Sequence, residues 1–464
     1  MSYKISFGTD GWRAIIAQDF TTENVARVSE AVVYWLKAGK INNPSIVLGH
    51  DCRFGGPLFL QTAVNVFSAH GIKVLAAEGV VSTPMVSLGT LHYKASLGII
   101  ITASHNPPSY NGYKIKGSFG GPLAPEHIQE IEGFIPESCS VDYTLKPKNA
   151  PEFVNLEELY LNRVRNAFDI ASIHQGPFRF AYDAMYGAGM GVMAKLFPDI
   201  PRLHSTYNPG FEGQAPEPIH KNLHVFSNFI KAEKTINCGL ATDGDADRIG
   251  LYNSKGAFVD SHHIILLLIH YLVKYKGIKG KVVTAFSTTS RIKTLCQHYG
   301  LEMETVKIGF KYICAIMVRE DVLLGGEESG GIAIKGHIPE RDGIWMGLTL
   351  WEFMSKTGKS LEALIDEVYA ITGSFHFDRL DLHISETQKQ SVLQRCEQDT
   401  IQSFGRYSIL KRETLDGYKY FISETSWIMI RASGTEPILR IYAEGSNESE
   451  VSQLLEAARH TLLN

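Results

Sequence analysis

The stretch IIITASHNP, residues 99–107, decides how the rest of the chain is interpreted. Its three isoleucines are typical of a buried strand, and the prolines at 107 and 108 prevent that strand from continuing. Ser104 is therefore expected at the carboxyl end of a strand, where open α/β sheets place their functional groups. Lys114 follows in the run NGYK. A simple turn with a surface lysine would give the same pattern, so the other motifs must decide.

The bulk composition is that of a globular protein. The chain has 464 residues, of which 44% are hydrophobic and 20% charged, and its length suggests about three domains. The formal net charge of -4 argues against a strongly basic nucleic-acid-binding protein. The six cysteines are scattered without a CxxC pair, so we expect reduced thiols and neither a disulfide framework nor a zinc site. Without an apolar signal-peptide core or a bilayer-length apolar stretch, we expect a cytoplasmic protein.

Helical and strand patterns alternate from the N-terminus. A helix is predicted from Thr22, which we expect to cap it, to Gly39, because the residues at 25, 28, 32 and 36 form one apolar face. Residues 45–49 then predict a buried strand that ends in HDCR, residues 50–53. The repeated alternation predicts a parallel sheet with helices on both faces. Proline-punctuated polar residues at 135–152 indicate a domain boundary, and residues 373–377 indicate a second.

The glycine cluster GAGMG, residues 187–191, does not indicate a nucleotide site. Val192 stands where the dinucleotide fingerprint requires glycine, and no P-loop ending in GK[ST] occurs in the chain. We therefore expect a tight turn between a strand and a helix at this place.

Three carboxylates stand at alternate positions in DGDADR, residues 243–248, between two apolar runs. Asp243, Asp245 and Asp247 would repel one another unless a positive charge holds them, and oxygen ligands suit Mg²⁺. An EF-hand is excluded, because Arg248 and Ser254 occupy the positions that require glycine and glutamate. A solvated acidic turn is the alternative, but it is a costly one between apolar strands.

Other polar loops follow predicted strands or turns. The loop GGEESGG, residues 325–331, offers the carboxylate and hydroxyl groups that read sugar hydroxyls, although a simple hairpin turn fits too. The loop RASGTEP, residues 431–437, could cradle a phosphate, or could be a hairpin loop with a solvated arginine. FGTDGWR, residues 7–13, suits a loop that approaches an anion, or an ordinary turn. The polar loop HIPERDG, residues 337–343, has no clear role from sequence.

Taken together, these motifs resemble those of the α-D-phosphohexomutase family. TASHNP, DGDADR, GEESG and RASGTEP match that family's serine, metal, sugar and phosphate loops in the same order, and FGTDGWR matches its N-terminal loop. The resemblance covers essentially the whole chain. It implies three similar mixed-sheet α/β domains and a smaller α+β C-terminal domain around a central cleft. The implied domains are residues 1–150 with the phosphoserine loop, 151–257 with the metal loop, 258–372 with the sugar loop and 373–464 with the phosphate loop.

The resemblance also implies roles for particular residues. Ser104 would carry a phosphate and, together with the three aspartates, would hold one Mg²⁺ per chain. Lys114 would be a general acid/base whose pKa Mg²⁺ and Arg248 nearby would lower, and His105 and Arg248 would assist catalysis. Substrate binding would fall to a larger set, namely Arg13, Lys311, Glu327, Ser329, Arg431, Ser433, Gly434 and Thr435. Arg53 would support the reacting phosphate with Arg13.

The implied activity is interconversion of hexose 1-phosphate and hexose 6-phosphate, with glucose 1,6-bisphosphate as intermediate and activator. Many bacterial members carry histidine where this chain has Gly331, and VKIGFK, residues 306–311, resembles the glucose-type enzymes. Phosphoglucomutase is therefore expected, as a monomer or homodimer acting on small hexose phosphates without nucleic acid or membrane partners. Phosphomannomutase or a dual-specificity enzyme, phosphoglucosamine mutase, a sugar-phosphate phosphatase and a non-catalytic sugar-phosphate binder are the alternatives.

Overall fold

The computed structural model of the chain describes residues 3–146, 149–432 and 438–463. The chain divides into two compact units. The first contains the residues up to Lys281 together with Gly309–Leu364, and the second contains Val282–Ile308 together with the residues from Ile365 onward. No helix within the described ranges combines the length and the apolar character needed to cross a bilayer.

The first sheet of the first unit is mixed. Its strand order is β1-β5-β4-β2-β3-β6, with bounds Trp12–Ile15, Tyr110–Gly117, Leu97–Ile101, Ser45–His50, Lys73–Val80 and Glu152–Val154. β4, β2, β3 and β6 are parallel, as the alternating sequence predicts. β5 is antiparallel to both β4 and β1, so the sheet is mixed, as the family resemblance implies, and the parallel pairing that the alternation predicts holds for the other four strands. The short connection between β4 and β5 explains the difference, since it leaves no room for a crossover helix.

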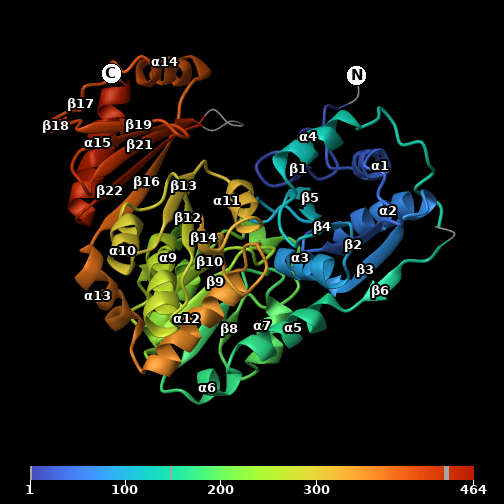
Figure 1. Ribbon diagram of the computed structural model, residues 1–464, viewed down its shortest axis with the longest axis horizontal. Coiled ribbons are helices and arrows are strands. Elements are labelled where there is room, and N and C mark those ends of the chain that lie inside the picture. Colours follow the sequence, from blue (N-terminus) through green and yellow to red (C-terminus); the bar gives the residue numbers. More distant parts are fainter. Residues whose placement is uncertain (1–2, 147–148, 433–437, 464) are drawn as a thin grey trace. The chain divides into compact units, whose positions relative to one another are not determined.

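Helices cover both faces of this sheet. α1 (Thr22–Ala38), α2 (Gly56–Ala69) and α4 (Pro125–Gly133) gather on one side in Figure 1 and share a hydrophobic core with the strands. α3 (Thr83–His92) packs on β2 and β4. Thr21, and not Thr22, caps α1, because its Oγ1 accepts a hydrogen bond from the Asn24 N–H at 3.2 Å.

The alternation of side chains along β5 sorts its residues between the two faces. Tyr113 and Ile115 lie in the core formed with α1 and α2. Lys114 and Lys116 point to the opposite face, and the side chains of both lysines are fully buried. A strand that reads as alternating apolar and charged residues therefore places two ammonium groups inside the unit. Such groups require buried carboxylate partners.

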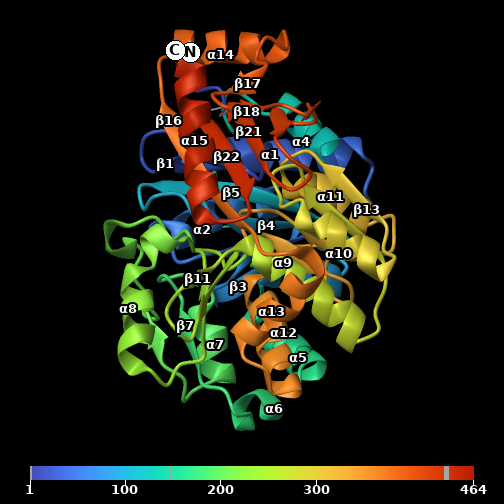
Figure 2. The ribbon, with the colours of Figure 1, turned by 90° about the vertical axis from the view of Figure 1, so that its left-hand side faces the viewer.

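The second sheet has the order β11-β10-β9-β7-β8, with bounds Phe258–Val259, Ile249–Asn253, Cys238–Thr242, Phe180–Asp183 and Arg202–Leu203. α8 (His224–Glu233) covers one face, where Phe226 and Ile230 pack against Gly239. α12 (Gly343–Thr357) covers the other, where Gly347 admits the side chain of Leu240. Figure 2 shows the strands between these two helices. The glycine cluster at 187–191 forms the turn between β7 and α7 (Met190–Leu196), as predicted.

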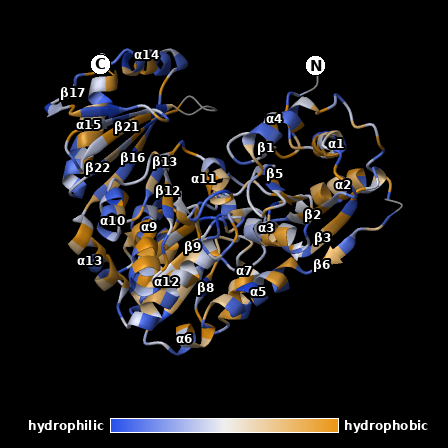
Figure 3. Ribbon diagram, in the orientation of Figure 1, coloured by the Kyte–Doolittle hydropathy of each residue, from blue (hydrophilic) through white to orange (hydrophobic). Residues whose placement is uncertain are grey.

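Further elements of the first unit pack near this sheet. α5 (Leu156–Ala167) packs against α3 and α7, and α6 (Ile170–Gln175) packs against α12. α9 (Ser261–His270) is hydrophobic over most of its surface (Figure 3) and continues as one π-helical turn, Tyr271–Tyr275. α11 (Phe310–Met317) packs on β14 (Val322–Gly326), which pairs with β15 (Ile332–Ile334) in an antiparallel hairpin.

The second unit combines a strand-helix-strand segment with an antiparallel sheet. β12 (Lys281–Ala285), α10 (Arg291–Tyr299) and β13 (Met303–Val306) form the segment, in which the two strands are parallel. The sheet order is β16-β22-β21-β20-β19, with bounds His376–His383, Ile438–Gly445, Trp427–Ala432, Tyr418–Phe421 and Lys411–Glu413. α15 (Glu448–Leu463) packs on β22 and β16, and α14 (Glu386–Glu397) packs on α15. The short hairpin β17 (Ser403–Phe404) and β18 (Tyr407–Ser408) lies beside α15, and α13 (Leu361–Thr372) precedes β16.

Candidate active site

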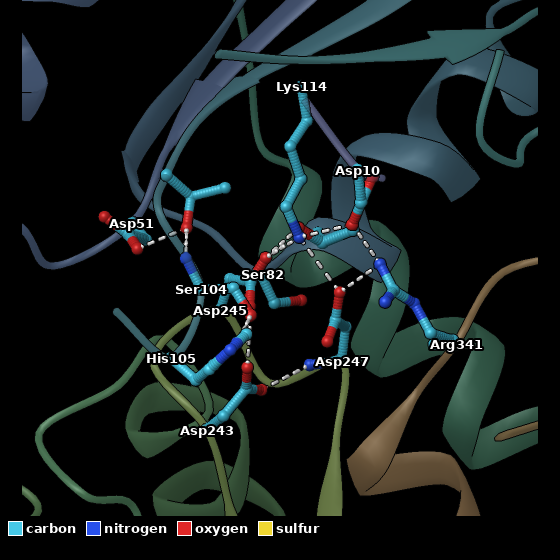
Figure 4. A network of polar contacts seen from close by, with 12 residues as sticks. Asp10, Asp51, Ser82, Ser104, His105, Lys114, Asp243, Asp245, Asp247 and Arg341 are labelled. Atoms are coloured by element: carbon cyan, nitrogen blue, oxygen red, sulfur yellow. Dashed lines mark hydrogen bonds and ion pairs between the residues drawn. The ribbon is translucent and has the colours of Figure 1, made fainter. Parts of the chain in front are cut away.

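Ser104 lies just beyond the end of β4 in a left-handed backbone conformation, with φ of 52°. This conformation costs a non-glycine residue roughly 1–3 kcal/mol and persists only where the surroundings hold it. The Ser104 N–H donates to Thr102 Oγ1 at 2.9 Å, and the Thr102 hydroxyl donates to Asp51 Oδ2 at 2.5 Å. These contacts, drawn in Figure 4, fix the orientation of the serine.

Arg53 holds the backbone of the serine loop. Its two terminal nitrogens donate to the carbonyl oxygens of residues 104, 106, 107 and 110 at 2.6, 2.7, 2.9 and 3.0 Å. The side chain is fully buried, and its Nε lies 3.4 Å from Asp51 Oδ2. Because its terminal donors bind the loop itself, Arg53 would support the reacting phosphate through the backbone that carries Ser104.

The three aspartates of residues 243–247 lie on the turn between β9 and β10, and all are buried. One carboxylate oxygen from each lies within 4.8 Å of the others. Asp243 Oδ2 accepts a hydrogen bond from the Ser104 hydroxyl at 2.6 Å, which joins the serine loop to the aspartate cluster. Among the described residues, the Oδ1 atoms of Asp245 and Asp247 have no hydrogen-bond partner.

This donor set fits a divalent cation. Burial, together with repulsion from Asp245 and Asp247, raises the pKa of Asp243 well above its usual range. Asp243 thus lies beside two carboxylates that each have an oxygen without a hydrogen-bond partner. A hard cation that prefers oxygen ligands would stabilise these three negative groups together. The residues present are therefore suited to hold Mg²⁺.

Lys114 lies between the aspartates and the N-terminal loop. Its Nζ is 2.7 Å from Asp245 Oδ2, 3.0 Å from Asp247 Oδ2 and 2.9 Å from Asp10 Oδ2. Burial alone would lower the pKa of Lys114, but the three carboxylates outweigh it and raise the pKa above its usual range. The carboxylates therefore act against the lowering of the Lys114 pKa that we expect from Mg²⁺ and Arg248 nearby. The sequence did not show that Asp10 would complete a set of three carboxylates around this ammonium.

Arg341 is the second cation of the cluster, and it comes from the loop that sequence left without a role. Its Nη2 lies 2.7 Å from Asp247 Oδ2 and also donates to Asp10 Oδ2. Burial would raise the pKa of Asp10, but Lys114, Lys116 and Arg341 outweigh it and hold the pKa well below its usual range. Lys114, Arg341, Asp10 and Asp247 thus form a ring of alternating charges, which Figure 4 shows.

The rest of the 337–343 loop is anchored by buried contacts. Glu340 pairs with Lys116 at 2.7 Å and accepts a hydrogen bond from the Ser87 hydroxyl at 3.0 Å. Asp342 caps α12 by accepting from the Trp345 N–H at 2.9 Å, and it lies 2.9 Å from His337 Nε2. These contacts hold the loop, and they fix where the Arg341 side chain begins.

Comparison with known families assigns the chain. Models of the phosphoglucomutase/phosphomannomutase alpha/beta/alpha domains I, II and III match residues 4–140, 158–256 and 260–371. The model of the family's C-terminal domain matches residues 407–461. The chain belongs to the phosphoglucomutase/phosphomannomutase family. The family's fold, three mixed-sheet α/β domains and an antiparallel C-terminal domain, is the one expected from the sequence, so the resemblance and the fold class are confirmed.

Relatives along the whole chain carry several enzyme names. A phosphoglucomutase/phosphomannomutase of Thermococcus kodakarensis is 27% identical over 97% of this chain and 96% of its own. A phosphoglucosamine mutase of Carboxydothermus hydrogenoformans is 29% identical over 97% of each chain. The crystal structure of a candidate phosphomannomutase of Thermus thermophilus is 34% identical, with a TM-score of 0.89 over 100% of both chains.

A more distant structure shares the fold. The Aspergillus fumigatus N-acetylphosphoglucosamine mutase, in complex with GlcNAc-6P and magnesium, is 15% identical with a TM-score of 0.60 over 99% of this chain and 96% of its own. The chain is thus a phosphohexomutase, an intramolecular phosphotransferase, as the sequence predicts.

Glu327 lies in the turn between β14 and β15 and is buried, and it is linked to the aspartate cluster through Arg341, which pairs with Asp247. Glu327 Oε1 accepts from the Gly309 N–H at 3.0 Å, and its Oε2 lies 4.0 Å from Arg341 Nη1. Burial raises the pKa of Glu327 to about 7, against the opposing charge of Arg341. Ser329 is half-buried in the same turn, and a backbone bridge joins Gly331 to Arg248.

The remaining predicted residues of the first unit surround Ser104 or lie on α11. Arg13 Nη1 donates to Asn106 Oδ1 at 2.6 Å, and Arg248 Nη1 lies 3.4 Å from Glu217 Oε1. His105 Nδ1 is 3.3 Å from the Ser104 hydroxyl. Burial and the surrounding cations hold the pKa of His105 well below its usual range. Lys311, on α11, is half-buried, with its Nζ 5.5 Å from the centre of the Tyr312 ring.

The predicted phosphate loop belongs to the second unit. Arg431 is the second-last residue of β21, and its Nε is 3.1 Å from Asp416 Oδ1. Ser433, Gly434 and Thr435 lie outside the described residues.

Sequence reasoning missed three residues of the cluster, namely Asp10, Thr83 and Arg341. The Thr83 hydroxyl donates to Asp245 Oδ2 at 2.5 Å, and the Thr83 N–H donates to the Asp245 carbonyl oxygen at 3.0 Å. Asp10 lies in the loop FGTDGWR and Arg341 in the loop HIPERDG. A charged residue in a loop rich in glycine or proline is the sequence pattern that could have indicated both as site residues. Thr83 gives no such signal, because a threonine at the start of a helix is ordinary.

Proposed function

We propose that the chain interconverts hexose 1-phosphate and hexose 6-phosphate, with glucose as the preferred sugar, by passing a phosphate through Ser104. The contact between the Ser104 hydroxyl and Asp243, 2.6 Å long, carries the proposal. This contact supports the assignment of Ser104 as a nucleophile that faces a cation site. A protein that only binds sugar phosphates would not need such a nucleophile. We propose the domain bounds 1–150, 151–257, 258–372 and 373–464 for this enzyme.

In the proposed reaction, phosphorylated Ser104 is the donor. A sugar hydroxyl attacks the phosphorus, the bond from phosphorus to Ser104 Oγ breaks, and the sugar becomes a bisphosphate. The proton of the attacking hydroxyl passes to a base, and an acid stabilises the serine oxygen as it leaves the phosphorus. After the bisphosphate turns around, the serine takes the other phosphate by the reverse step.

Lys114, which contacts Asp245 and Asp247, and His105, which contacts Ser104, can handle protons. Lys114 remains an ammonium among its three carboxylates, so we assign it as the acid and as a stabiliser of charge on the transferring group. His105 remains neutral at ordinary pH, because burial and neighbouring cations lower its pKa, and its Nδ1 lies 3.3 Å from the serine oxygen. We therefore assign His105 as the group that takes the Ser104 hydroxyl proton in the return step, when the serine attacks the bisphosphate, with Arg248 and Arg13 contributing positive charge.

Asp243, Asp245 and Asp247 would hold one Mg²⁺ with an oxygen of the Ser104 phosphate. When bound, the cation would neutralise negative charge on the phosphoryl group. The unpartnered Oδ1 atoms of Asp245 and Asp247 support this assignment.

The sugar and its second phosphate need separate binding groups. We propose that Glu327 and Ser329 bind sugar hydroxyls, and the buried Glu327 carboxylate beside Arg341 supports this assignment. From the family resemblance, we propose that Arg431, Ser433, Gly434 and Thr435 bind the phosphate that is not transferred, assisted by Lys311. Fixing that phosphate would supply binding energy to align the reacting end.

Turnover measurements test the sugar preference. Glucose 1-phosphate, mannose 1-phosphate and glucosamine 1-phosphate would be supplied separately, with Mg²⁺ and a trace of glucose 1,6-bisphosphate. A strong preference for glucose supports the proposal, which rests on Gly331 and the segment at 306–311. Equal rates with mannose, or a preference for glucosamine, would contradict it, since relatives with each of these names match the chain.

A further inference from the structure

Gly331 stands at a crowded place in the sugar-binding hairpin. A Cβ atom built on it would lie 2.4 Å from Arg341 Cδ, 3.1 Å from Arg341 Cγ and 3.3 Å from Glu327 Oε2. The backbone of Gly331 does not adopt a left-handed conformation, so the glycine is required for space and not for backbone freedom. The stem of Arg341 fills the volume that a side chain at 331 would need.

The Arg341 side chain cannot move aside at low cost. Its guanidinium contacts Asp247 and Asp10, and its side chain is 5% exposed. Its Cζ lies 5.5 Å from the centre of the Phe310 ring. If the guanidinium swung away, Asp247 and Asp10 would each lose one of their two close cations and keep Lys114. Displacing the stem therefore means breaking contacts at the other end of the side chain.

Glu327 depends on its charged neighbours. Arg341 and Arg248 are the cations that act on it, and Glu328 and Asp10 are the anions. Arg341 is the strongest of these influences, and its Nη1 lies 4.0 Å from Glu327 Oε2. A buried carboxylate with a weaker cation beside it would take up a proton at higher pH. A protonated carboxyl accepts hydrogen bonds from sugar hydroxyls less well than a carboxylate.

We propose that Arg341 is a positioning residue for sugar binding: it keeps the Glu327 carboxylate ionised and in place, and Gly331 reserves the space for its stem. The inference rests on the proposed function, in which Glu327 binds sugar hydroxyls. It gives a physical reason for glycine at a position where many bacterial members of the family carry histidine.

Binding of glucose 6-phosphate to the Ser104→Ala protein tests the proposal without turnover. The affinity would be measured by calorimetry across a pH series around 7. In this parent, binding should strengthen as pH rises through the pKa of Glu327, which is about 7. Adding Arg341→Met should move the midpoint upward by about one pH unit or more, which corresponds to a tenfold weaker acid. The phosphate of the ligand also titrates, but it does so equally in every variant.

Further variants separate charge from a general structural effect. Arg341→Lys keeps a positive charge and should recover most of the midpoint shift. Gly331→Ala should move the pH midpoint of binding in the same direction as Arg341→Met. In the double variant that carries both substitutions, Gly331→Ala should move the midpoint little further. Arg165→Met is the matched control, because Arg165 pairs only at the surface, with Glu158.

The outcomes distinguish the two levels of the proposal. If the Ser104→Ala parent does not bind any hexose phosphate, the proposed function fails. If the parent binds but Arg341→Met leaves the midpoint where it was, the positioning role of Arg341 is wrong. If Gly331→Ala and Arg341→Met have fully additive effects, the two residues do not share the same space.

Discussion

Replacing Arg53 by methionine should damage both stability and turnover. The substitution keeps much of the apolar stem but removes the guanidinium that donates to four carbonyl oxygens between residues 104 and 110. It also removes the partner of Asp51, whose Oδ2 accepts from the Thr102 hydroxyl that in turn holds the Ser104 N–H. Two supports of the left-handed serine are therefore lost at once.

The magnitude follows from the contacts. Hydrogen bonds from a charged donor contribute about 1.5–3 kcal/mol each, but four bonds from one side chain are not additive. Breaking a buried ion pair costs about 3–5 kcal/mol. Burial already raises the pKa of Asp51 to about 6, so this carboxyl can take up a proton and limit the loss. We expect unfolding to become easier by roughly 3–5 kcal/mol, and turnover to fall about a hundredfold because the nucleophile is displaced.

Chemical denaturation and hexose phosphate turnover would measure the two effects. Arg165→Met serves as the control, since its exposed pair with Glu158 should contribute less than about 1 kcal/mol. Arg53→Lys should lie between the wild type and Arg53→Met, because an ammonium cannot reach all the carbonyl oxygens. Wild-type stability and turnover in Arg53→Met would refute the scaffold role.

Other substitutions and conditions give distinct expectations. Ser104→Ala should abolish mutase turnover while leaving thermal unfolding within a few degrees of the wild type; measurable turnover would contradict the phosphoserine route. Removing divalent cations with a chelator should stop turnover, and adding Mg²⁺ back should restore it. Because burial and the neighbouring carboxylates raise the pKa of Asp243, Mg²⁺ should bind more weakly as the pH falls. Calorimetric titration with Mg²⁺ at several pH values would measure this, and an affinity that does not change with pH would contradict the assignment of Asp243 as a ligand. Glu340→Leu should destabilise the first unit by about 3–5 kcal/mol, because Lys116 would lose its partner at 2.7 Å and keep Asp10 at 3.7 Å. Adding Lys116→Met should restore much of this in urea unfolding, whereas no recovery would show that the pair is not the cause.

The parts of the site that sequence could predict are those carried by short contiguous motifs. Ser104 and the three aspartates follow apolar strands within a few residues, so local pattern was enough to single them out. The ring that Asp10 and Arg341 complete could not be predicted, because those residues are hundreds of positions apart and meet only through tertiary packing.

In the fold, as in the site, local sequence patterns predicted the elements, whereas features set by tertiary packing could not be predicted. Strand and helix alternation in the first 100 residues predicted the parallel part of the first sheet. The direction of β5 is set by its connection to β4, and the single run NGYK showed neither its direction nor that Lys114 would be buried. The pKa of Lys114 could not be predicted for the same reason, because two of its three carboxylate partners come from a different sheet.

The alternation along β5 also bears on how faithfully the first sheet assembles. A slip of one residue between β4 and β5 would send Lys114 and Lys116 into the core and would turn Tyr113 and Ile115 toward the carboxylates. Such a misaligned sheet would bury two unpaired ammonium groups, each at a cost of several kcal/mol. The same lysines that serve the active site thus act against misfolded strand pairings, so that a chain in the wrong register is too unstable to persist.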